Sequence, residues 1–492
     1  MTTLFGAALR AHAGHPRAPA AIASPDGDLS YAELVARVER CAAWLVREGC
    51  TPSTAVGVSV VDETESLVVS LALLFLGLPQ AWLSTQAPRE MRLALATRLA
   101  VGRLVVDDGA HALPGIAASV WSSDACRTMP AVAVAALQPD PDASAVFASS
   151  SGTTGVPKVL ALSQRVIAWR ARQLASVQAF APDERVLVPM SNQEYAGKSM
   201  RLYAHFVGCT SIDWPGGQPP ISRLPAYGVA ARVSTLQPTV LQARALVGSI
   251  DVEGRLPAST RAYLGASRMP SGLPAAFEAR VGGRLYNRYG TTEIGIVATM
   301  YPDGDDGTPD SVGRPSEGVE VEIVGGDGRS LPPGEPGEIR LRAECMVRGY
   351  HDDPDATAKH FVDGWFYPRD VAMITAGGVL RFLGRKDDMM VLNGINIFPA
   401  EIERVLEEHP AVASAAAFPI PSAVHGDVPV AAVELRMPAA VDIPQLAAFA
   451  RERLGVRAPR RITILAALPR NAAGKVAKRE LARLLAPRAT ET

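Results

Sequence analysis

Apolar positions in the N-terminal part of the chain follow two alternating patterns. Helical spacing joins four of them, Leu34, Val38, Cys41 and Leu45. Ser30 and Glu33 stand just before this set with the spacing of a capping box, so we expect a helix to begin here. Short apolar runs at residues 56–61, 104–106 and 185–189 instead favour strands. Strands that alternate with helices are typical of a parallel α/β sheet.

Two further stretches extend the helical pattern. The run at residues 67–78 is almost wholly apolar, which predicts a buried helix. It is too short to span a bilayer, so no membrane span is expected. A second helix is predicted over residues 199–207, after an unusually polar segment at residues 190–198.

The pattern changes from residue 302. Short β segments such as 319–324 and 338–342 are separated by Gly- and Pro-rich turns, which predicts a small antiparallel barrel or meander. The charged run Gly-Arg-Lys-Asp-Asp at residues 384–388 ends this region. Beyond it Pro399 can open a helix, and helices and strands fill roughly a hundred residues, a normal domain size.

These patterns predict an α/β protein in two parts. The large N-terminal domain, residues 1–384, is expected to hold parallel α/β subdomains and a β-barrel-like part at about 302–384. Residues 385–388 are predicted to be a hinge, and residues 389–492 a small α+β C-terminal domain. The length of 492 residues supports a division, because single cores stop growing at roughly 250–300 residues.

The composition narrows the class of protein. A hydrophobic content of 48% with 20% charged residues is ordinary for globular proteins. The net charge of −1 gives no reason to expect nucleic acid as a partner. The five cysteines form no Cys-x-x-Cys motif, and the start of the chain lacks a basic segment followed by a long apolar run. We therefore expect reduced thiols and a cytoplasmic location.

The first candidate for chemistry is the segment Ser-Ser-Ser-Gly-Thr-Thr-Gly-Val-Pro-Lys at residues 149–158. It lies between two apolar runs that favour strands, and it offers hydroxyls, backbone N–H groups and the cation of Lys158. Such a loop suits a polyphosphate, because successive N–H groups in a turn form an anion-binding concavity. Its glycine spacing differs from that of the common P-loop, and a solvated turn is the alternative for this segment alone.

Lysine is scarce in this chain. Only six lysines occur, and two of them, Lys158 and Lys475, lie beside glycine-containing loops. A flexible ammonium group suits a phosphate and a carboxylate whose geometry changes better than the rigid fork of arginine does. Both lysines are therefore candidates for contact with phosphate.

Five separated motifs give these loops a common context. They lie in order at residues 149–158, 289–293 (Tyr-Gly-Thr-Thr-Glu), 364–370 (Gly-Trp-Phe-Tyr-Pro-Arg-Asp), 384–388 and 469–475. Over nearly its whole length the chain resembles the ANL adenylate-forming superfamily, which contains acyl-CoA and aryl-CoA synthetases, nonribosomal-peptide adenylation domains and luciferases. Each motif alone is weak, but five in the same order support one another.

The resemblance implies a reaction in two steps with a mobile C-terminal domain. A carboxylate attacks the α-phosphorus of ATP and releases pyrophosphate, and a thiol then accepts the acyl group. The implied cofactors are ATP and Mg²⁺, and the implied partners are a small-molecule acid and either CoA or the phosphopantetheine of a carrier protein. The chemistry requires neutralisation of the phosphate charge and positioning of the nucleophile.

The resemblance also implies roles for individual residues. Lys475 would bridge the acid and the α-phosphate, Lys158 would hold the outer phosphates, and Thr292 would touch the α-phosphate. Glu293 would carry Mg²⁺, which prefers carboxylate and phosphate oxygens. Asp387 would be the pivot for rotation of the C-terminal domain. The implied nucleotide-binding residues are Ser150, Ser151, Gly152, Thr153, Thr154, Gly155, Lys158, Gly265, Ala266, Ser267, Asn287, Tyr289, Gly290, Thr291, Thr292, Asp370, Arg385 and Lys475.

The sequence departs from the family pattern at several positions. Arg369 stands where the family usually has glycine, and Asn393 stands where CoA-using relatives often carry a basic residue. The acid pocket is expected at the polar segment, from Asn192, Glu194, Tyr195 and Lys198. A buried charge needs a partner, which favours a small or polar acid over a long-chain fatty acid. The alternative is that Glu194 and Lys198 form an i,i+4 ion pair at the start of a helix.

Several functions fit the resemblance. The leading one is an ATP-dependent acid ligase that forms an acyl- or aryl-adenylate and passes the acyl group to CoA. One alternative is loading of a separate carrier protein. Another is an amine acceptor, or activation of nitrite for diazotisation. A non-catalytic ATP-binding protein is least favoured, because the chain retains Lys475 and Glu293.

Overall fold

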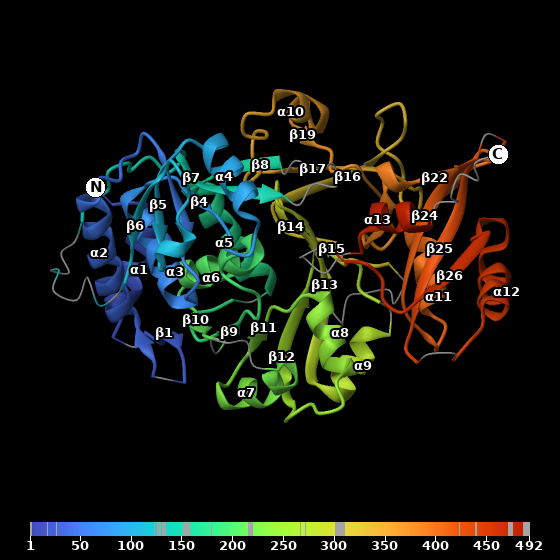
Figure 1. The fold of residues 1–492 in the computed structure, drawn as a ribbon, viewed down its shortest axis with the longest axis horizontal. Helices are drawn as coiled ribbons and strands as arrows, with labels where there is room; N and C mark the ends of the chain where they lie inside the picture. Colours follow the sequence, from blue (N-terminus) through green and yellow to red (C-terminus); the bar gives the residue numbers. More distant parts are fainter. Residues whose placement is uncertain are drawn as a thin grey trace.

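The computed structural model describes most of the chain. The described residues are 2–16, 18–25, 27–122, 124, 129, 134–150, 158–178, 180–214, 220–265, 267–270, 272–300, 310–422, 424–437, 440–470 and 476–485, with only the backbone of Ser150 included. Seven of the predicted site residues lie outside them: Ser151, Gly152, Thr153, Thr154, Gly155, Ala266 and Lys475. Figure 1 shows α/β units at the N-terminal end, antiparallel strands at the centre, and a separate domain at the C-terminal end.

Two largely parallel sheets make up the first part of the chain. The first has the order β6 (Ala117–Val120), β5 (Val101–Val106), β3 (Ala55–Ser59), β4 (Gln80–Trp82), β7 (Ser144–Ser150), β8 (Lys158–Ser163), and only β7 and β8 pair antiparallel. The second has the order β15 (Arg314–Pro315), β14 (Gly295–Thr299), β13 (Gly282–Thr291), β12 (Leu256–Leu264), β11 (Thr235–Leu236), β9 (Arg185–Leu187), β10 (Thr210–Ile212), β1 (Ala20–Ala23), β2 (Leu29–Ser30). Its strands from β13 to β1 are parallel.

Helices cover these sheets. They are α1 (Leu4–Ala13), α2 (Tyr31–Arg47), α3 (Glu63–Leu76), α4 (Arg89–Arg98), α5 (Gln164–Gln178), α6 (Tyr195–Val207), α7 (Leu224–Ala230), α8 (Val240–Gly248) and α9 (Leu273–Arg280). The predicted capping box is present, with the Ser30 side chain accepting from the N–H of Glu33 at the start of α2. Most of the apolar run at residues 67–78 lies in α3, which is buried along most of its length, as predicted.

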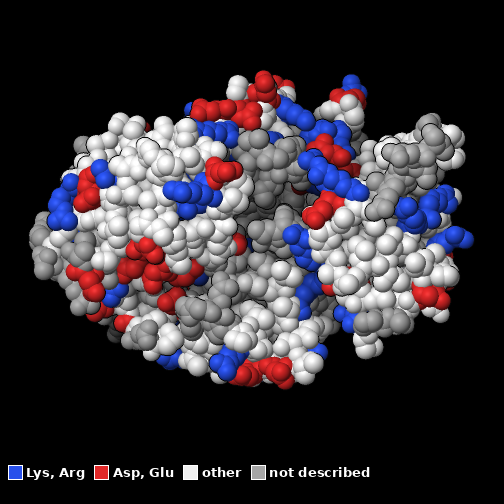
Figure 2. Space-filling model, in the orientation of Figure 1, with Lys and Arg blue, Asp and Glu red and all other residues white. Residues whose placement is uncertain are grey.

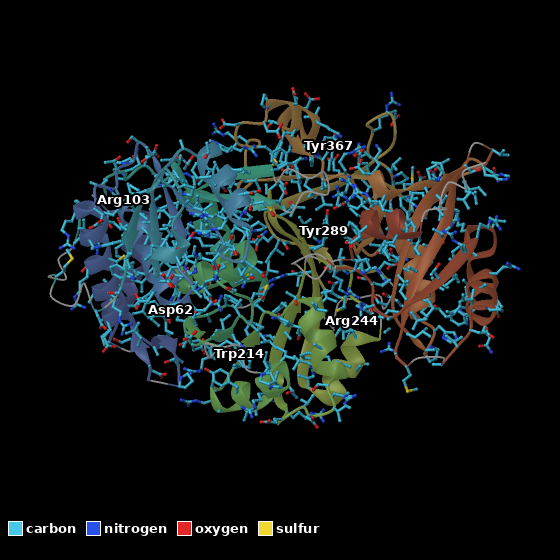
Figure 3. The ribbon with its side chains drawn as sticks, in the orientation of Figure 1. Asp62, Arg103, Trp214, Arg244, Tyr289 and Tyr367 are labelled. Carbon is cyan, nitrogen blue, oxygen red and sulfur yellow. The ribbon has the colours of Figure 1, made fainter. Side chains whose placement is uncertain are left out.

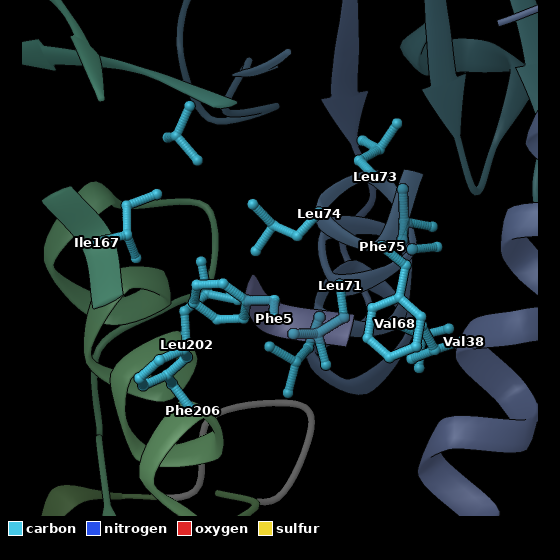
Figure 4. Packing of buried hydrophobic residues seen from close by; sticks show 14 of the residues in the cluster. Phe5, Val38, Val68, Leu71, Leu73, Leu74, Phe75, Ile167, Leu202 and Phe206 are labelled. Carbon is cyan, nitrogen blue, oxygen red and sulfur yellow. The ribbon is translucent and has the colours of Figure 1, made fainter. Parts of the chain in front are cut away.

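The largest hydrophobic cluster joins α1, α2, α3, α5 and α6. Figure 4 shows Phe5 of α1 between Leu71 and Leu74 of α3 on one side and Leu202 and Phe206 of α6 on the other. The rings of Phe5 and Phe206 lie 5.0 Å apart at a tilt. Burial of each such side chain stabilises the folded protein by about 1.5–3 kcal/mol. This cluster therefore fixes the position of α6 relative to the first sheet.

Helix α6 begins four residues earlier than its apolar pattern predicts. The sequence indicated a start at residue 199, but the helix runs from Tyr195. Gly197 explains the difference, because a Cβ at this position would lie 2.2 Å from the carbonyl oxygen of Ser191. Only glycine allows the helix to start so close to the preceding turn. Tyr195 and Lys198, from the polar segment, are therefore helical residues.

The central part of the chain forms an antiparallel sheet. Its strands run in the order β18 (Phe361–Val362), β19 (Trp365–Phe366), β17 (Gly337–Ala343), β20 (Asp370–Ile374), β21 (Leu380–Arg385), and β16 (Val319–Val324) pairs with β17. The helix α10 (Pro354–His360) leads directly into β18. Figure 2 shows acidic and basic side chains interspersed around α10 on the face in view.

The C-terminal domain follows a short 3₁₀ turn at Lys386–Asp388. Its sheet has the order β23 (Ile395–Ile397), β22 (Met390–Leu392), β25 (Gly426–Leu435), β24 (Val412–Ser422), and β26 (Arg461–Leu465) pairs parallel to β25. The helices are α11 (Pro399–Glu407), α12 (Ile443–Leu454) and α13 (Lys478–Leu485). The α/β fold class, with parallel sheets, an antiparallel part and a small C-terminal domain, is as predicted.

Polar contacts join the C-terminal domain to the rest of the protein. Arg268 forms an ion pair with Glu407 of α11, and Arg404 of the same helix lies 3.2 Å from Asp310. Arg244 of α8, labelled in Figure 3, donates to the carbonyl of Ala413. No helix among the described residues is long and apolar enough to cross a membrane.

Candidate active site

Asp370 is a buried carboxylate with a hydrogen-bond donor on each of its oxygens. It begins β20 and is buried, with 4% of its surface exposed. The Tyr289 hydroxyl donates to Oδ2 at 2.5 Å, and the Arg385 guanidinium donates to Oδ1 at 2.9 Å. Burial raises the pKa of the Asp370 carboxyl, while Arg385 and Tyr289 act against that rise. The carboxylate is therefore held in place by two donors from two different strands.

The backbone register explains how this group forms. Asp370 and Arg385 are direct partners across the antiparallel strands β20 and β21. Tyr289 comes from β13. The centroid of its ring lies 5.8 Å from that of Phe382 on β21. Figure 3 shows Tyr289 near the centre of the molecule, between the α/β part and the C-terminal domain. Cross-strand partners meet without any loop ordering, so the carboxylate and its arginine are fixed by the sheet itself.

Arg385 also connects Asp370 to the predicted hinge. It donates to the carbonyl of Pro368 at 2.8 Å, and its other nitrogen lies 3.7 Å from Oδ2 of Asp387. Arg369 contacts the same carboxylate, with Nη2 3.1 Å from Oδ1 of Asp387. Asp387 is thus held between two arginines.

Arg369 has a backbone conformation that favours glycine. Its φ is +67°, in the left-handed region, which agrees with the glycine that the family usually has here. Its side chain lies 3.1 Å from Glu338 as well as close to Asp387. Lys386 donates to the same Glu338 at 2.7 Å. These ion pairs tie the loop before Asp370 to the turn that begins the C-terminal domain.

Glu293 and Lys158 are brought together by one tyrosine. The hydroxyl of Tyr350 donates to Oε1 of Glu293 at 2.8 Å. The ring of the same Tyr350 lies 4.7 Å from the ammonium group of Lys158. Glu293 is buried in the turn after β13, and Lys158 is the first residue of β8. Two residues that are 135 positions apart therefore meet at one aromatic side chain.

His360 completes this group. Its Nδ1 lies 2.8 Å from the carbonyl oxygen of Tyr367, which can only accept, so the proton is on Nδ1. Its Nε2 lies 2.8 Å from Nζ of Lys158 and accepts from it. Burial lowers the pKa of His360, and burial also lowers the pKa of Lys158. A neutral histidine thus holds the lysine of the predicted phosphate loop.

The predicted adenine-binding residues lie at the ends of two parallel strands. Asn287 of β13 pairs with Leu264, the last residue of β12, and Gly265 follows directly. The Asn287 amide donates to the carbonyl of Ser311 at 3.2 Å. In α/β sheets, ligands bind beyond the carboxyl ends of the strands, which is where these residues lie. Ser267 is half-buried on the same loop.

The turn after β13 holds the remaining motif residues. Gly290 pairs with Ile296 across β14, and a Cβ at Gly290 would lie 2.4 Å from the carbonyl oxygen of Gly295. The Thr291 hydroxyl accepts from the N–H of Ile294 at 3.2 Å. Thr292 follows on the same turn and is half-exposed. The glycine therefore allows β13 and β14 to approach closely just before the turn that carries Glu293.

Two of the residues predicted to form the acid pocket differ in burial. Asn192 is buried in contacts with α3, where its amide donates to the carbonyl of Glu63 at 2.6 Å. Glu194 is exposed at the start of α6 and forms no ion pair with Lys198. The alternative of an i,i+4 pair is therefore wrong. Its physical reason is that Lys198 is 1% exposed and packs inward, while Glu194 faces solvent.

Tyr195 and Lys198 lie inward. The ring of Tyr195 stacks on that of Trp82 with the centroids 5.8 Å apart, and its hydroxyl accepts from Arg170 at 3.2 Å. Arg170 also donates to the backbone carbonyl of Glu293 at 2.9 Å. Arg170 of α5 therefore joins the start of α6 to the turn that carries Glu293.

Sequence reasoning missed Arg170, His360 and Tyr350. For Arg170 a signal existed, since it lies at helical spacing between Ile167 and Leu174, both buried. A charged residue on an apolar helix face indicates a buried partner. His360 and Tyr350 carried no such signal, because their partners are far away along the chain.

Family models match both parts of the chain. The AMP-binding enzyme model covers residues 9–351, and the model of the AMP-binding enzyme C-terminal domain covers residues 401–475. The chain belongs to the AMP-binding, adenylate-forming enzyme family. The resemblance inferred from the five motifs is therefore confirmed.

Relatives of this AMP-binding enzyme include several CoA ligases. The sulfoacetate–CoA ligase of Cupriavidus necator is 32% identical over 382 residues, which are 77% of this chain and 72% of the relative. The indoleacetate–CoA ligase of Aromatoleum aromaticum is 29% identical over 507 residues, covering 96% of this chain and 97% of the relative. The protein is an enzyme of the AMP-forming acid–CoA ligase family.

Solved structures agree with the fold. ATP-bound MatB from Rhodopseudomonas palustris superposes with a TM-score of 0.88 at 25% identity, covering 98% of this chain and 99% of MatB. The amide bond synthetase McbA from Marinactinospora thermotolerans gives a TM-score of 0.85 at 24% identity and shares the fold. The fold of this AMP-binding enzyme is thus compatible with bound ATP.

Proposed function

We propose that the protein activates a small, polar carboxylic acid with ATP and transfers the acyl group to CoA. The observation that carries this proposal is the contact between two distant motif residues: Lys158 and Glu293 share the side chain of Tyr350. Asp370 is held by Arg385 and by Tyr289, which begins the motif that ends in Glu293. A polyphosphate site needs a cation and a carboxylate for a metal ion, and a ribose site needs a fixed acceptor.

Each group has a role in this proposal. Asp370 would accept hydrogen bonds from the ribose hydroxyls, and Asn287 and Tyr289 would enclose the adenine. Lys158, with Thr153 and Thr154, would hold the outer phosphates. Thr292 would contact the α-phosphate, and Lys475 would bridge it to the acid. Arg385 would keep Asp370 in place.

Glu293 fits the implied Mg²⁺. Mg²⁺ is commonly bound by one or two carboxylates together with substrate phosphates, and no group of three or more metal-ligating side chains occurs among the described residues. Glu293 supplies one carboxylate beside the Lys158 ammonium. When bound, Mg²⁺ would neutralise phosphate charge. Tyr350 would keep the Glu293 carboxylate oriented toward the phosphates.

The bonds that form and break are simple. An oxygen of the acid attacks the α-phosphorus, and the bond from that phosphorus to the bridging oxygen breaks, so pyrophosphate leaves. The sulfur of CoA then attacks the acyl carbonyl, its proton is lost, and AMP leaves. Both steps depend on positioning and charge neutralisation.

The choice of acid and acceptor rests on the relatives and on α6. The two ligases named above act on acids that carry a sulfonate or an indole ring besides the carboxyl group. Both names give CoA as the acceptor. A buried lysine on α6 favours a polar acid over a long aliphatic chain, because an apolar chain would leave the ammonium group without a partner.

The test is ATP–pyrophosphate exchange with a panel of acids, followed by mass spectrometry with CoA added. Lys475→Ala should abolish exchange, whereas Lys478→Ala should not. Lys478 is a matched control, since it pairs with Glu403 at 2.6 Å within the C-terminal domain. Exchange that is unchanged in Lys475→Ala would remove this lysine from the mechanism, and a preference for long-chain fatty acids would contradict the proposed substrate class.

A further inference from the structure

Lys198 is a buried lysine whose ammonium group has no ionic partner among the described residues. The residue is 1% exposed. Its Nζ lies 5.0 Å from the centroid of the Trp82 ring, and the described residues provide no hydrogen bond or ion pair to it. Burial of an unpaired charge is costly, so such a group normally finds a partner or loses its charge.

The nearest carboxylate is already engaged. Glu63, at the start of α3, accepts from the N–H of Asn192 at 2.7 Å and from the hydroxyl of Ser191 at 2.8 Å. Arg201 lies 3.6 Å from the same carboxylate and supplies a positive charge to it. Arg201 itself donates to the carbonyls of Val188 and Met190 and is fully engaged in the core. Of the two cations near Glu63, Arg201 is paired with this carboxylate and Lys198 is not.

The surroundings of Lys198 lead to the active site. The Trp82 ring on which it lies stacks against Tyr195. Tyr195 accepts from Arg170, and Arg170 donates to the carbonyl of Glu293. A small cavity between α5, α6 and β7 is lined in part by Trp82, Tyr195 and Ser199. The ammonium group therefore lies over a ring that lines this cavity, and Tyr195 and Arg170 connect that ring to the backbone carbonyl of Glu293.

We propose that Lys198 binds a second anionic group on the acid substrate, a carboxylate or a sulfonate, and so selects short acids with two anionic groups. This inference rests on the proposed function and names its substrate class. The first carboxylate of the substrate would react at the α-phosphate. The second would pair with Lys198 over the face of Trp82, where the ring already favours the ammonium group.

The charge of Lys198 changes with pH close to neutrality. The pKa of Lys198 is lowered to about 7, mainly by burial, with Glu63 opposing the shift and Arg201 adding to it. Glu194 is the other charged residue on this end of α6; its side chain is exposed, but partial desolvation and the charge of Glu63 raise its pKa. Without ligand the lysine loses its proton as pH rises through about 7, and a bound anion would retain the proton.

The experiment compares acids of matched shape in ATP–pyrophosphate exchange. Sulfoacetate is paired with methylsulfonylacetate, and succinate with succinamate, so that each pair differs mainly in one negative charge. In the unmodified protein, kcat/KM should be about ten- to a hundredfold higher for the doubly charged member. In Lys198→Met, which keeps the volume and removes the charge, this preference should disappear.

The control is Arg172→Gln. Arg172 is also a cation over an aromatic ring, 5.4 Å from that of Phe206, but it lies exposed on α5. Its replacement should leave the preference between the paired acids unchanged. A fall in both Lys198→Met and Arg172→Gln would assign the effect to general charge rather than to Lys198 and would overturn the inference.

A second measurement needs no variant. The ratio of kcat/KM for sulfoacetate to that for methylsulfonylacetate should fall roughly twentyfold between about pH 6.5 and about pH 8.5, because only protonated Lys198 binds the second anion. The ratio cancels any titration that affects both acids. A ratio that stays constant over this range overturns the inference even if Lys198→Met fails to fold.

The outcomes separate this inference from the proposed function. Exchange that is equal or faster with the neutral members overturns the role of Lys198 and leaves the acid ligase in place. Absence of exchange with every acid tested overturns the proposed function, and the inference with it. A preference for the charged members that is lost in Lys198→Met supports both.

Discussion

The proposed nucleotide side and the proposed acid side of the site differ in how their charged groups are paired. On the nucleotide side, Asp370 has Arg385 and Tyr289, and Lys158 has His360. On the acid side, Lys198 is buried with an aromatic ring but without a carboxylate among the described residues. ATP is the same in every reaction of the family, so the groups that bind it can be held in advance by other residues of the protein. The acid differs between enzymes, so a charged group that binds it can receive its ionic partner from the substrate.

The largest effect is expected on the nucleotide side. Asp370→Ala should lower kcat/KM for ATP by roughly a thousandfold, because two charge-assisted hydrogen bonds to ribose at about 1.5–3 kcal/mol each would be lost. The change also leaves Arg385 and Tyr289 without their acceptor. The measurement is the ATP dependence of pyrophosphate exchange, with thermal melting to confirm that the variant is folded. An unchanged KM for ATP would contradict the assignment of Asp370 to ribose.

A smaller loss is expected when the partner of Lys158 is removed. His360→Ala should lower kcat/KM for ATP by about tenfold, since one hydrogen bond that positions a charged group is worth about 1.5 kcal/mol. His360→Gln should restore most of the activity, because its Oε1 can accept from Lys158 as Nε2 does. Equal losses in the two variants would mean that His360 acts through packing instead.

The same histidine predicts a pH dependence. Burial lowers the pKa of His360, with Lys158 and Lys359 adding to the effect and Glu293 and the carbonyl of Tyr367 opposing it. The neutral form therefore stabilises the protein fully above the ordinary pKa, and this stability is lost as pH falls through the lowered value. Protonation would also place a donor against Lys158. Activity of the unmodified protein should fall in this acidic range, while that of His360→Gln should fall less.

An intermediate effect is expected at the hinge. In Arg369→Gly the left-handed conformation becomes free of strain, which offsets the loss of the exposed ion pair with Asp387, worth about 0–1 kcal/mol, and of the partly buried ion pair with Glu338. Adenylation should change less than about threefold, while transfer to CoA should become several times faster, because Asp387 would be held by Arg385 alone. Single-turnover transfer from the adenylate measures this. Transfer that is unchanged in Arg369→Gly would show that these ion pairs do not restrain the turn.

The smallest effect is expected for Glu194, on the acid side. Glu194→Gln should change kcat/KM for any acid by less than about twofold, since the side chain is exposed and does not pair with Lys198. Exchange assays with the paired acids described above provide the measurement. A loss of kcat/KM comparable to that in Lys198→Met would place Glu194 in the acid pocket. Lys198 would then have a carboxylate partner, as the charged groups on the nucleotide side do.

The sequence predicted those parts of the protein that depend on neighbouring residues. The capping box of α2 and the apolar run of α3 each follow from local spacing. The motif that ends in Asp370 also lies at the start of a strand, where a short pattern of residues can be recognised. Fold class followed from the alternation of such elements.

The pairings could not be predicted, because they are set by strands far apart in the chain. His360 meets Lys158 across 202 positions, and Arg170 meets the Glu293 carbonyl across 123. That Lys198 has no ionic partner among the described residues could not be predicted either, because it lies four positions after Glu194 and this spacing alone suggested an ion pair. In the structure Lys198 is buried and Glu194 is exposed, because the hydrophobic cluster around Phe206 fixes the rotation of α6 about its axis.

Arg170 has a consequence for how the binding of one substrate changes the affinity for the other. One guanidinium holds both the Tyr195 hydroxyl and the carbonyl of Glu293, so a displacement of either is transmitted to the other. Two ligands that bias one shared element change each other's affinity by the same factor, whichever binds first. We therefore expect the dissociation constant of ATP to depend on whether the acid is bound, and that of the acid to depend equally on ATP. In Arg170→Met the two binding events should become independent.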